Sequence, residues 1–264
     1  MRWPTGFILA ALTFAVAPHA LAREPIRRTW EVAGVNRQAE IWLPEQKSTN
    51  GAPVVFLFHG HGGNARQIAR SMPIPQLWPE ALVVCMQGLP TPGQLTDREG
   101  KLNGWQAAPG DQGDRDLAFF DAVLTTLRRD YPIDARRIHA TGHSNGGGFT
   151  YLLWAMRRDV FAAFAPSSAV AGRFAHRLTP APVLHLAGRN DELVKFAWQE
   201  RMIAHLRELN SCAATGTREG GYVTRYASAS GNPTATFIHN GGHQLPAAAS
   251  AAVVEFLRAQ ARTE

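Results

Sequence analysis

The chain has 264 residues, of which 45% are hydrophobic and 18% are charged. This composition excludes a wholly disordered protein, and one α/β domain can use this length. The formal net charge is +6. The basic residues are scattered, as in the pairs Arg128-Arg129 and Arg157-Arg158, without a stripe of interleaved aromatic residues, so we expect no nucleic-acid partner. No protein partner is implied either.

The first 22 residues have the pattern of a signal peptide. Arg2 gives a positive start, and residues 7–17 form an apolar run that is too short for a membrane-spanning helix. Ala20-Leu21-Ala22 then fits the small-residue cleavage site of exported proteins. We therefore expect a mature chain that begins at Arg23, is secreted or periplasmic and has no stable membrane insertion. The alternative is a retained membrane anchor.

Residues 23–264 are expected to form a single domain. Residues 29–42 read as an antiparallel pair of strands, and 217–227 as a further candidate strand. Apolar runs predict strands near 54–58, 82–86, 137–141, 161–166, 183–188 and 234–238. Helical spacing of apolar residues predicts helices near 65–71, 115–130, 146–158, 194–209 and 246–261. This alternation predicts a doubly wound, mostly parallel sheet with helices on both faces.

A glycine-rich loop, His59-Gly60-His61-Gly62-Gly63, follows the strand at 54–58. Such a loop can aim a backbone N–H, here that of His61, at an anion that develops during a reaction. The alternative is a metal site, because two histidines lie two residues apart. No nearby Asp, Glu or Cys completes a ligand set, so we expect no metal.

The segment 87–113 is rich in glycine and proline and is too long for a simple connection. It carries Trp105, which we expect either as a stacking wall for a bound aryl or sugar group or as a plug in the core. Only two cysteines are present, Cys85 and Cys212. They could form one bridge, although two separate thiols are the favoured expectation.

Residues 142–146, Gly-His-Ser-Asn-Gly, form a G-x-S-x-G sequence between a predicted strand and a predicted helix. This is the context of a nucleophile elbow, in which a strained turn holds the serine at its tip. Ser144 is therefore the candidate nucleophile, and the N–H of Asn145 is a second candidate donor to an oxyanion. The alternative is an ordinary serine in a glycine-rich turn.

Two further residues complete a candidate triad. Asp191 follows the strand predicted at 183–188, and His243 follows the last predicted strand. The order Ser, Asp, His is that of α/β-hydrolases, in which the histidine takes the serine proton and the acid orients the histidine. Glu192 is a substitute for the acid, but Asp191 fits the loop better.

Several motifs together resemble one group of α/β-hydrolases, the polyhydroxybutyrate depolymerase-like and feruloyl or acetylxylan esterases. The motifs are His59-Gly60-His61-Gly62-Gly63-Asn64-Ala65, Gly104-Trp105, Asp116-Leu117-Ala118-Phe119, Arg137-Ile138, Gly142-His143-Ser144-Asn145-Gly146-Gly147 and Gly241-Gly242-His243-Gln244-Leu245-Pro246. The likeness covers nearly all of the chain after residue 28. It implies an α/β-hydrolase domain whose nucleophile, acid and base are Ser144, Asp191 and His243.

The sequence departs from this group at two places. Leu245 stands before Pro246 where the group often has Trp, and this bears on the substrate subgroup. The group often pairs a cysteine near Cys212 with a later one, whereas residues 222–232 contain Ser228 and Ser230 and no cysteine. The disulfide that the resemblance implies is therefore missing.

These features predict an exported serine esterase that needs no cofactor. Its substrates would be small or oligomeric esters, either hydroxyalkanoate oligomers or feruloyl and acetyl sugar esters. The short predicted connection 167–181 implies that no large cap domain covers the site. The alternatives are a serine peptidase of the same fold and a non-catalytic protein that binds carbohydrate or polymer on a hydrolase scaffold.

Overall fold

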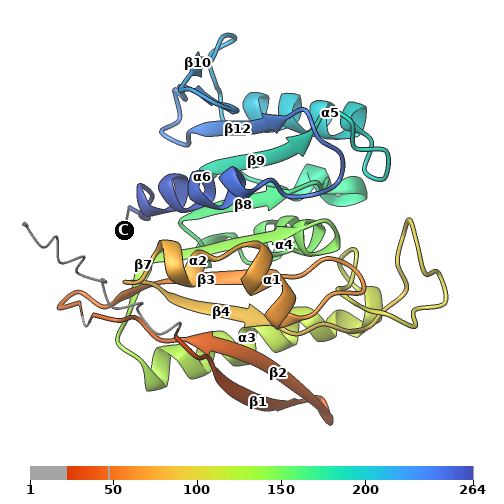
Figure 1. Cartoon of the computed structure of the whole chain (residues 1–264), viewed down its shortest axis with the longest axis vertical. Helices are drawn as coiled ribbons and strands as arrows, with labels where there is room; N and C mark the ends of the chain where they lie inside the picture. The colour runs from red at the N-terminus through yellow and green to blue at the C-terminus, as the bar shows by residue number, and fades with distance from the viewer. Residues whose placement is uncertain (1–22, 47, 264) are drawn as a thin grey trace, which may run out of the picture.

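The computed structural model describes residues 23–46 and 48–263, so the predicted signal peptide lies outside the described residues. A ten-stranded sheet runs through the described part of the chain (Figure 1). In spatial order its strands are β1 (Ile26–Val32), β2 (Val35–Trp42), β4 (Leu82–Met86), β3 (Ala52–Phe58), β7 (Ile133–His143), β8 (Ala163–Ser167), β9 (Val183–Gly188), β12 (Thr234–His239), β11 (Val223–Tyr226) and β10 (Thr217–Arg218).

The six central strands, from β4 to β12, are parallel, and the two strands at each edge are antiparallel. The chain passes from β3 to β4 on one side and then returns to β7 on the other side of β3. The direction in which the chain adds strands to the sheet therefore reverses between β3 and β7. In open α/β sheets such a switch point opens a crevice at the carboxyl ends of the strands.

Helices cover both faces of the sheet, as Figure 1 shows, with α1, α2 and α6 in front of it. These three span Ala65–Ser71, Ile74–Leu77 and Ala247–Arg258. The other face carries α3 (Arg115–Asp130), α4 (Asn145–Met156) and α5 (Phe196–Leu209). Short 3₁₀ helices occupy Asp111–Asp114, Arg158–Val160 and Gly172–Arg177.

The central strands are apolar throughout because each of their faces meets a helix layer. In β3, Val54, Phe56 and Phe58 pack in the core beneath α3 and α4, whereas Val55 and Leu57 pack in the core beneath α1 and α6. The predicted α/β-hydrolase fold, with a mostly parallel sheet and helices on both faces, is confirmed. Within the described residues, the connection from β8 to β9 holds only a short 3₁₀ helix and no cap domain.

Two segments have structure that the sequence did not specify. The excursion after β4 contains a small hairpin of β5 (Leu89–Pro90) and β6 (Asn103–Gly104). The candidate strand at 217–227 is two short strands, β10 and β11, which extend the sheet.

Both cysteines are free thiols. Cys85 is buried in β4. Cys212 follows α5, where its backbone pairs with that of Ser228 in an isolated antiparallel β-bridge. The hydroxyls of Ser228 and Ser230 both donate to the carbonyl of Asn210, at 2.5 and 2.9 Å. Serine hydroxyls thus hold the two segments together at the place where the resemblance implied a disulfide.

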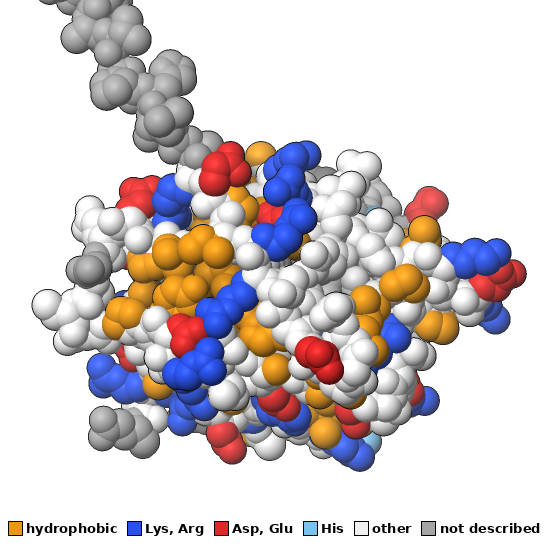
Figure 2. Space-filling view, turned by 90° about the horizontal axis from the view of Figure 1, so that it is seen from below, with side chains coloured by type: hydrophobic (Ala, Val, Ile, Leu, Met, Phe, Trp, Pro, Cys, Tyr) orange, Lys and Arg blue, Asp and Glu red, His pale blue; other side chains and the backbone are white. Residues whose placement is uncertain are grey.

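The surface agrees with the scattered basic residues of the sequence. On the face in Figure 2, Lys and Arg side chains lie among Asp and Glu side chains. Among the described residues, several basic side chains are paired with acids, for example Arg157 with Asp121 at 2.6 Å. Among the helices of the described residues, none is both long enough and apolar enough to cross a membrane.

Candidate active site

Ser144 stands at a strained turn between β7 and α4. Its φ of 56° and ψ of −120° lie in a region that residues other than glycine rarely adopt. The turn is tight because a Cβ at Gly146 would lie 2.3 Å from the carbonyl oxygen of Phe58, and one at Gly142 would lie 2.5 Å from that of Gly146. Only glycines allow β3, β7 and α4 to approach this closely, which is what the elbow sequence predicted.

The three candidate triad residues lie in one hydrogen-bonded row. Nε2 of His243 lies 2.8 Å from Oγ of Ser144, and Nδ1 of His243 lies 2.9 Å from Oδ2 of Asp191. The loops after β9 and β12 run side by side, joined by the bond from the Asn190 N–H to the Gly241 carbonyl. Parallel strands bring their carboxyl ends to one edge of the sheet, and so three distant segments meet there.

The Asp191 carboxylate is buried, and both of its oxygens accept hydrogen bonds. Oδ1 accepts from the backbone N–H groups of Leu193 and Val194, at 3.0 and 2.9 Å. Oδ2 accepts from Nε2 of Gln199 at 3.1 Å, besides its contact with His243. Glu192, the substitute acid, is exposed. The geometry therefore favours Asp191 as the partner of His243.

His143, the residue before Ser144, lies beside His243 at the site. Its Nδ1 is 3.2 Å from the hydroxyl of Ser167, and its ring centroid is 4.9 Å from that of His243. Burial lowers the pKa of His143 to about 4, so this ring is neutral at pH 7. A second positive charge is thus kept away from His243.

The loop after β3 lies beside the serine, since a Cβ at Gly60 would be 3.5 Å from Cβ of Ser144. Among the described residues, no hydrogen bond uses the backbone N–H of His61 or that of Asn145. Both predicted donors are therefore free to bind an oxyanion. The N–H of the next residue, Gly62, is already bonded to the carbonyl of Asn103 at 2.7 Å.

Both donors are anchored through their own side chains. The amide of Asn145 accepts from the N–H of Trp105 at 2.7 Å and donates to the Trp105 carbonyl at 3.2 Å. Nε2 of His61 lies 2.9 Å from Oδ2 of Asp97, a residue of the loop that joins β5 to β6. Asn145 and His61 are thus tied to the excursion between β4 and α3.

The two histidines of this loop have separate partners. His59 is buried, with Nδ1 at 2.7 Å from the Gly60 carbonyl, and its Nε2 accepts from the Gly88 N–H at 2.9 Å. Burial lowers the pKa of His59 to about 4. His61 instead pairs with Asp97. Among the described residues, no three His, Cys, Asp or Glu side chains are grouped to hold a metal ion.

The prediction that Trp105 forms a substrate wall is wrong. Its side chain is fully buried, stacks on Phe149 at a centroid distance of 5.1 Å and donates to the His59 carbonyl at 2.9 Å. It fills the core beneath the loop after β3, which was the alternative expectation. A large aromatic ring gains more from complete burial in a well-packed site than from exposure in a loop.

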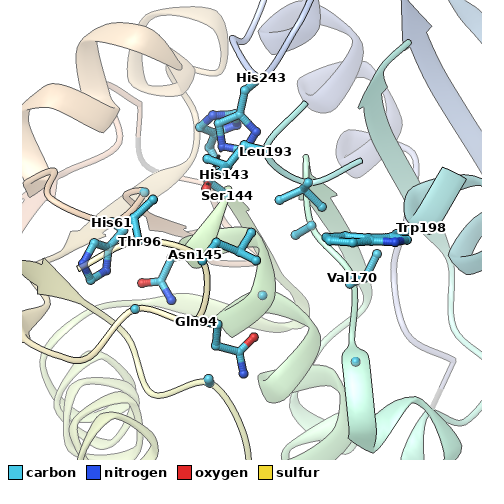
Figure 3. Close-up of a pocket in the computed structure, with 18 of the residues that line it drawn as sticks. His61, Gln94, Thr96, His143, Ser144, Asn145, Val170, Leu193, Trp198 and His243 are labelled. Carbon is cyan, nitrogen blue, oxygen red and sulfur yellow. Dashed lines mark hydrogen bonds between the residues drawn. The ribbon is translucent and has the colours of Figure 1, made fainter. Parts of the chain in front are cut away.

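A pocket of about 410 Å³ opens above Ser144. Figure 3 shows Ser144, His143 and His243 at one end of the pocket, with an apolar wall to one side and a more polar wall to the other. The apolar wall includes Val170, Leu193 and Trp198. The polar wall includes His61, Gln94 and Thr96. The aromatic residue of the pocket is therefore Trp198 of α5.

Sequence reasoning missed Trp198 and Gln199. One signal was available, because both lie in the first turn of the helix that follows the acid loop. Residues in that position are close to the acid, whichever way the helix faces. The helical pattern did not show which of its residues point toward the pocket.

No model of a known protein family matches the chain. The chain is 28% identical over 215 residues to a probable feruloyl esterase C from Aspergillus clavatus, covering 78% of this chain and 75% of that protein. It is 29% identical over 126 residues to a bifunctional acetylxylan esterase/xylanase from Neocallimastix patriciarum, covering 47% of this chain and only 18% of that much longer protein. Among solved structures, the acetyl xylan esterase from Aspergillus awamori superposes with a TM-score of 0.69 at 12% identity, covering 88% and 99% of the two chains. A thermostable esterase superposes with a TM-score of 0.65 at 18% identity, covering 90% of this chain and 64% of that one.

The fold is that of the α/β-hydrolases. The sequence relatives agree with the resemblance, since they carry the names feruloyl esterase and acetylxylan esterase. The chain is therefore similar in sequence to proteins named as esterases, and it shares the fold of solved esterases.

Proposed function

We propose that the chain is an exported serine esterase that works through an acyl-enzyme. The observation that carries this proposal is the row of hydrogen bonds from Asp191 through His243 to Ser144, which ends at a pocket of molecular size. A serine hydroxyl is a weak nucleophile by itself, and it needs an adjacent base that a third group orients. Here His243 is the adjacent base, and Asp191 is the group that orients it.

In the first half of the reaction, Oγ of Ser144 attacks the ester carbonyl carbon while Nε2 of His243 takes the hydroxyl proton. The carbonyl oxygen becomes an oxyanion, which the N–H groups of His61 and Asn145 receive. Asp191 stabilises the imidazolium without taking its proton. His243 then gives the proton to the leaving alcohol, and the acyl group stays on Ser144.

In the second half, water replaces the alcohol. His243 removes a proton from this water as it attacks the acyl carbon, and the same two N–H groups hold the second oxyanion. Collapse of this intermediate releases the acid and returns the proton to Ser144. Each proton moves between atoms of the chain, the substrate and water, so the cycle uses no cofactor.

The proposed substrates are hydroxyalkanoate oligomers or feruloyl and acetyl sugar esters. The two walls of the pocket support esters with one apolar part and one hydroxylated part. Val170 and Trp198 suit a hydrocarbon or aryl group, and Gln94 and Thr96 offer hydrogen bonds to hydroxyls. The names of the relatives favour the feruloyl and acetyl esters.

The proposed activity is tested with a fluorophosphonate probe and a set of nitrophenyl and sugar esters. The wild type should be labelled on Ser144 and should hydrolyse at least the small esters. Ser144→Ala should fold normally, take no label and lose nearly all turnover. An unlabelled wild type would favour the non-catalytic binding protein, and cleavage of peptides but not esters would favour the peptidase.

Export is proposed from residues 1–22 alone. Protein recovered from the periplasm or medium of a bacterial host should begin at Arg23 by mass spectrometry. Chains that keep Met1 and stay in the membrane fraction would favour the retained anchor.

A further inference from the structure

A chain of buried polar side chains leads from Asp191 away from the pocket into the core. Beyond Gln199 it contains His185 of β9 and Tyr151 of α4, and all three side chains are fully buried. The hydroxyl of Tyr151 lies 2.6 Å from Nδ1 of His185. These residues lie between the sheet and the helices α4 and α5, in the layer opposite α6.

The amide of Gln199 can have only one orientation. Its Nε2 donates to Oδ2 of Asp191 at 3.1 Å and to the Val194 carbonyl at 2.7 Å. A flipped amide would place its oxygen against the Asp191 carboxylate and the Val194 carbonyl, which would repel it. Oε1 must therefore point away from Asp191.

In this orientation Oε1 of Gln199 is a buried acceptor, and Nε2 of His185 is a buried ring nitrogen that could donate to it. Within the described residues, Oε1 of Gln199 and Nε2 of His185 each lack a hydrogen-bond partner of good geometry. Burial lowers the pKa of His185 to about 4, and the nearby Gln199 side chain partly opposes that effect. A small adjustment would pair these two atoms.

The protonation states fit this pairing. His185 is neutral at pH 7 because of its lowered pKa, and burial raises the pKa of the Tyr151 hydroxyl far enough that it keeps its proton. Tyr151 has no other acceptor among the described residues, so its hydroxyl donates to Nδ1 of His185. The ring proton then stands on Nε2, where it can be donated to Oε1 of Gln199.

We propose that Gln199, His185 and Tyr151 form a buried positioning chain that holds the Asp191 carboxylate in place and limits how strongly it attracts the His243 proton. The proposal rests on the proposed function, since it assigns these residues to the support of the triad. None of the three lines the pocket, so they are positioning residues and not catalytic ones.

The chain should affect the pH dependence of activity. A carboxylate oxygen that accepts two hydrogen bonds holds each of them less strongly than an oxygen that accepts one. Without the Gln199 donor, Oδ2 of Asp191 would favour the imidazolium form of His243, which cannot accept the serine proton. The other titratable groups near His243 are His143 and His239, and burial lowers the pKa of both.

The test compares Gln199→Met with the wild type in nitrophenyl acetate hydrolysis between pH 5 and 9. Met has a similar volume but cannot donate a hydrogen bond. We expect kcat to fall about tenfold, the loss of one hydrogen bond to a charged group, with KM unchanged. The midpoint of the acidic limb should move up by about half a pH unit. Tyr151→Phe should move it in the same direction by less.

Leu206→Ala is the matched control, because Leu206 is a buried apolar residue of the same helix, α5. It should lower the thermal midpoint and leave the acidic limb unchanged. An acidic limb that stays at its wild-type midpoint in both Gln199→Met and Tyr151→Phe would overturn the proposal, as would an equal shift in Leu206→Ala. Activity retained by Ser144→Ala would instead remove the proposed function itself.

Discussion

Replacing Asp191 by Asn should nearly abolish activity without removing a single side-chain heavy atom. The two oxygens of Asp191 have different partners. Oδ1 accepts from two backbone N–H groups, those of Leu193 and Val194. In the Asp191→Asn variant the atom at this position must stay an oxygen, and so the new NH₂ group takes the place of Oδ2.

That NH₂ group would face Nδ1 of His243 at about the present 2.9 Å. A donor at this place requires Nδ1 to be the acceptor, so the ring proton moves to Nε2 and points at Oγ of Ser144. The imidazole then has no lone pair for the serine proton, and no anion stabilises its charged form. For such a tautomer change we expect a loss of about 10⁴-fold in kcat.

The assay is hydrolysis of nitrophenyl acetate at pH 8, with circular dichroism to confirm folding. Glu192→Gln is the matched control, since it makes the same chemical change at the exposed neighbouring acid and should keep full activity. If the Asp191→Asn variant kept a tenth or more of wild-type kcat, the orientation argument would be refuted. If Glu192→Gln lost as much activity as Asp191→Asn, the assignment of the acid would be refuted.

Three other predictions test different parts of the structure. Gly146→Ala should cost about 3 kcal/mol or more of stability, because its Cβ would lie 2.3 Å from the Phe58 carbonyl oxygen. Gly148→Ala, in open space on the same helix, should not lower the thermal midpoint. Equal thermal midpoints for the two variants would contradict this prediction. Trp198→Ala should raise KM for a bulky aryl ester by roughly tenfold with little effect on an acetate ester. Trp105→Ala should mainly lower stability, by about 3–5 kcal/mol. Calorimetry and kinetics on both variants separate a role in substrate binding from a role in core packing. Stability should fall as the pH drops from about 6.5 toward 4, since four histidines, three buried and one, His143, half-buried, stay neutral in the folded chain but gain protons when it unfolds. Their pKa values are lowered by burial to about 4 for His59, His143 and His185 and to about 3 for His139. A thermal midpoint that stays constant from pH 7 to 5 would contradict this last prediction.

The sequence predicted the central strands to within a few residues because these strands are buried on both faces. A run such as 54–58 is apolar at every position, and this pattern differs from that of an amphipathic helix. The elbow was equally visible, since the glycines around Ser144 are required by contacts of less than 3 Å. These features have local signatures.

Other features have none. The strands β5 and β6 are two residues long, and their pairing depends on the loop from 91 to 102 between them. Whether Trp105 or Trp198 would face the pocket was decided by tertiary packing. Trp105 fits between Phe58 and Phe149, and neither contact is apparent from spacing along the chain. The same holds for Gln199, because its hydrogen bonds to Asp191 and Val194 depend on how α5 packs.

The backbone β-bridge between Cys212 and Ser228, and the serine hydrogen bonds beside it, have a consequence for the compartment in which the protein can fold. Hydroxyls of Ser228 and Ser230 hold the Asn210 carbonyl, and so no oxidation step is needed to close this part of the chain. Disulfides require an oxidising compartment, but serine hydrogen bonds form equally well in a reducing one. The domain should therefore reach its native state in a bacterial cytoplasm, and reductants such as dithiothreitol should leave its thermal midpoint unchanged.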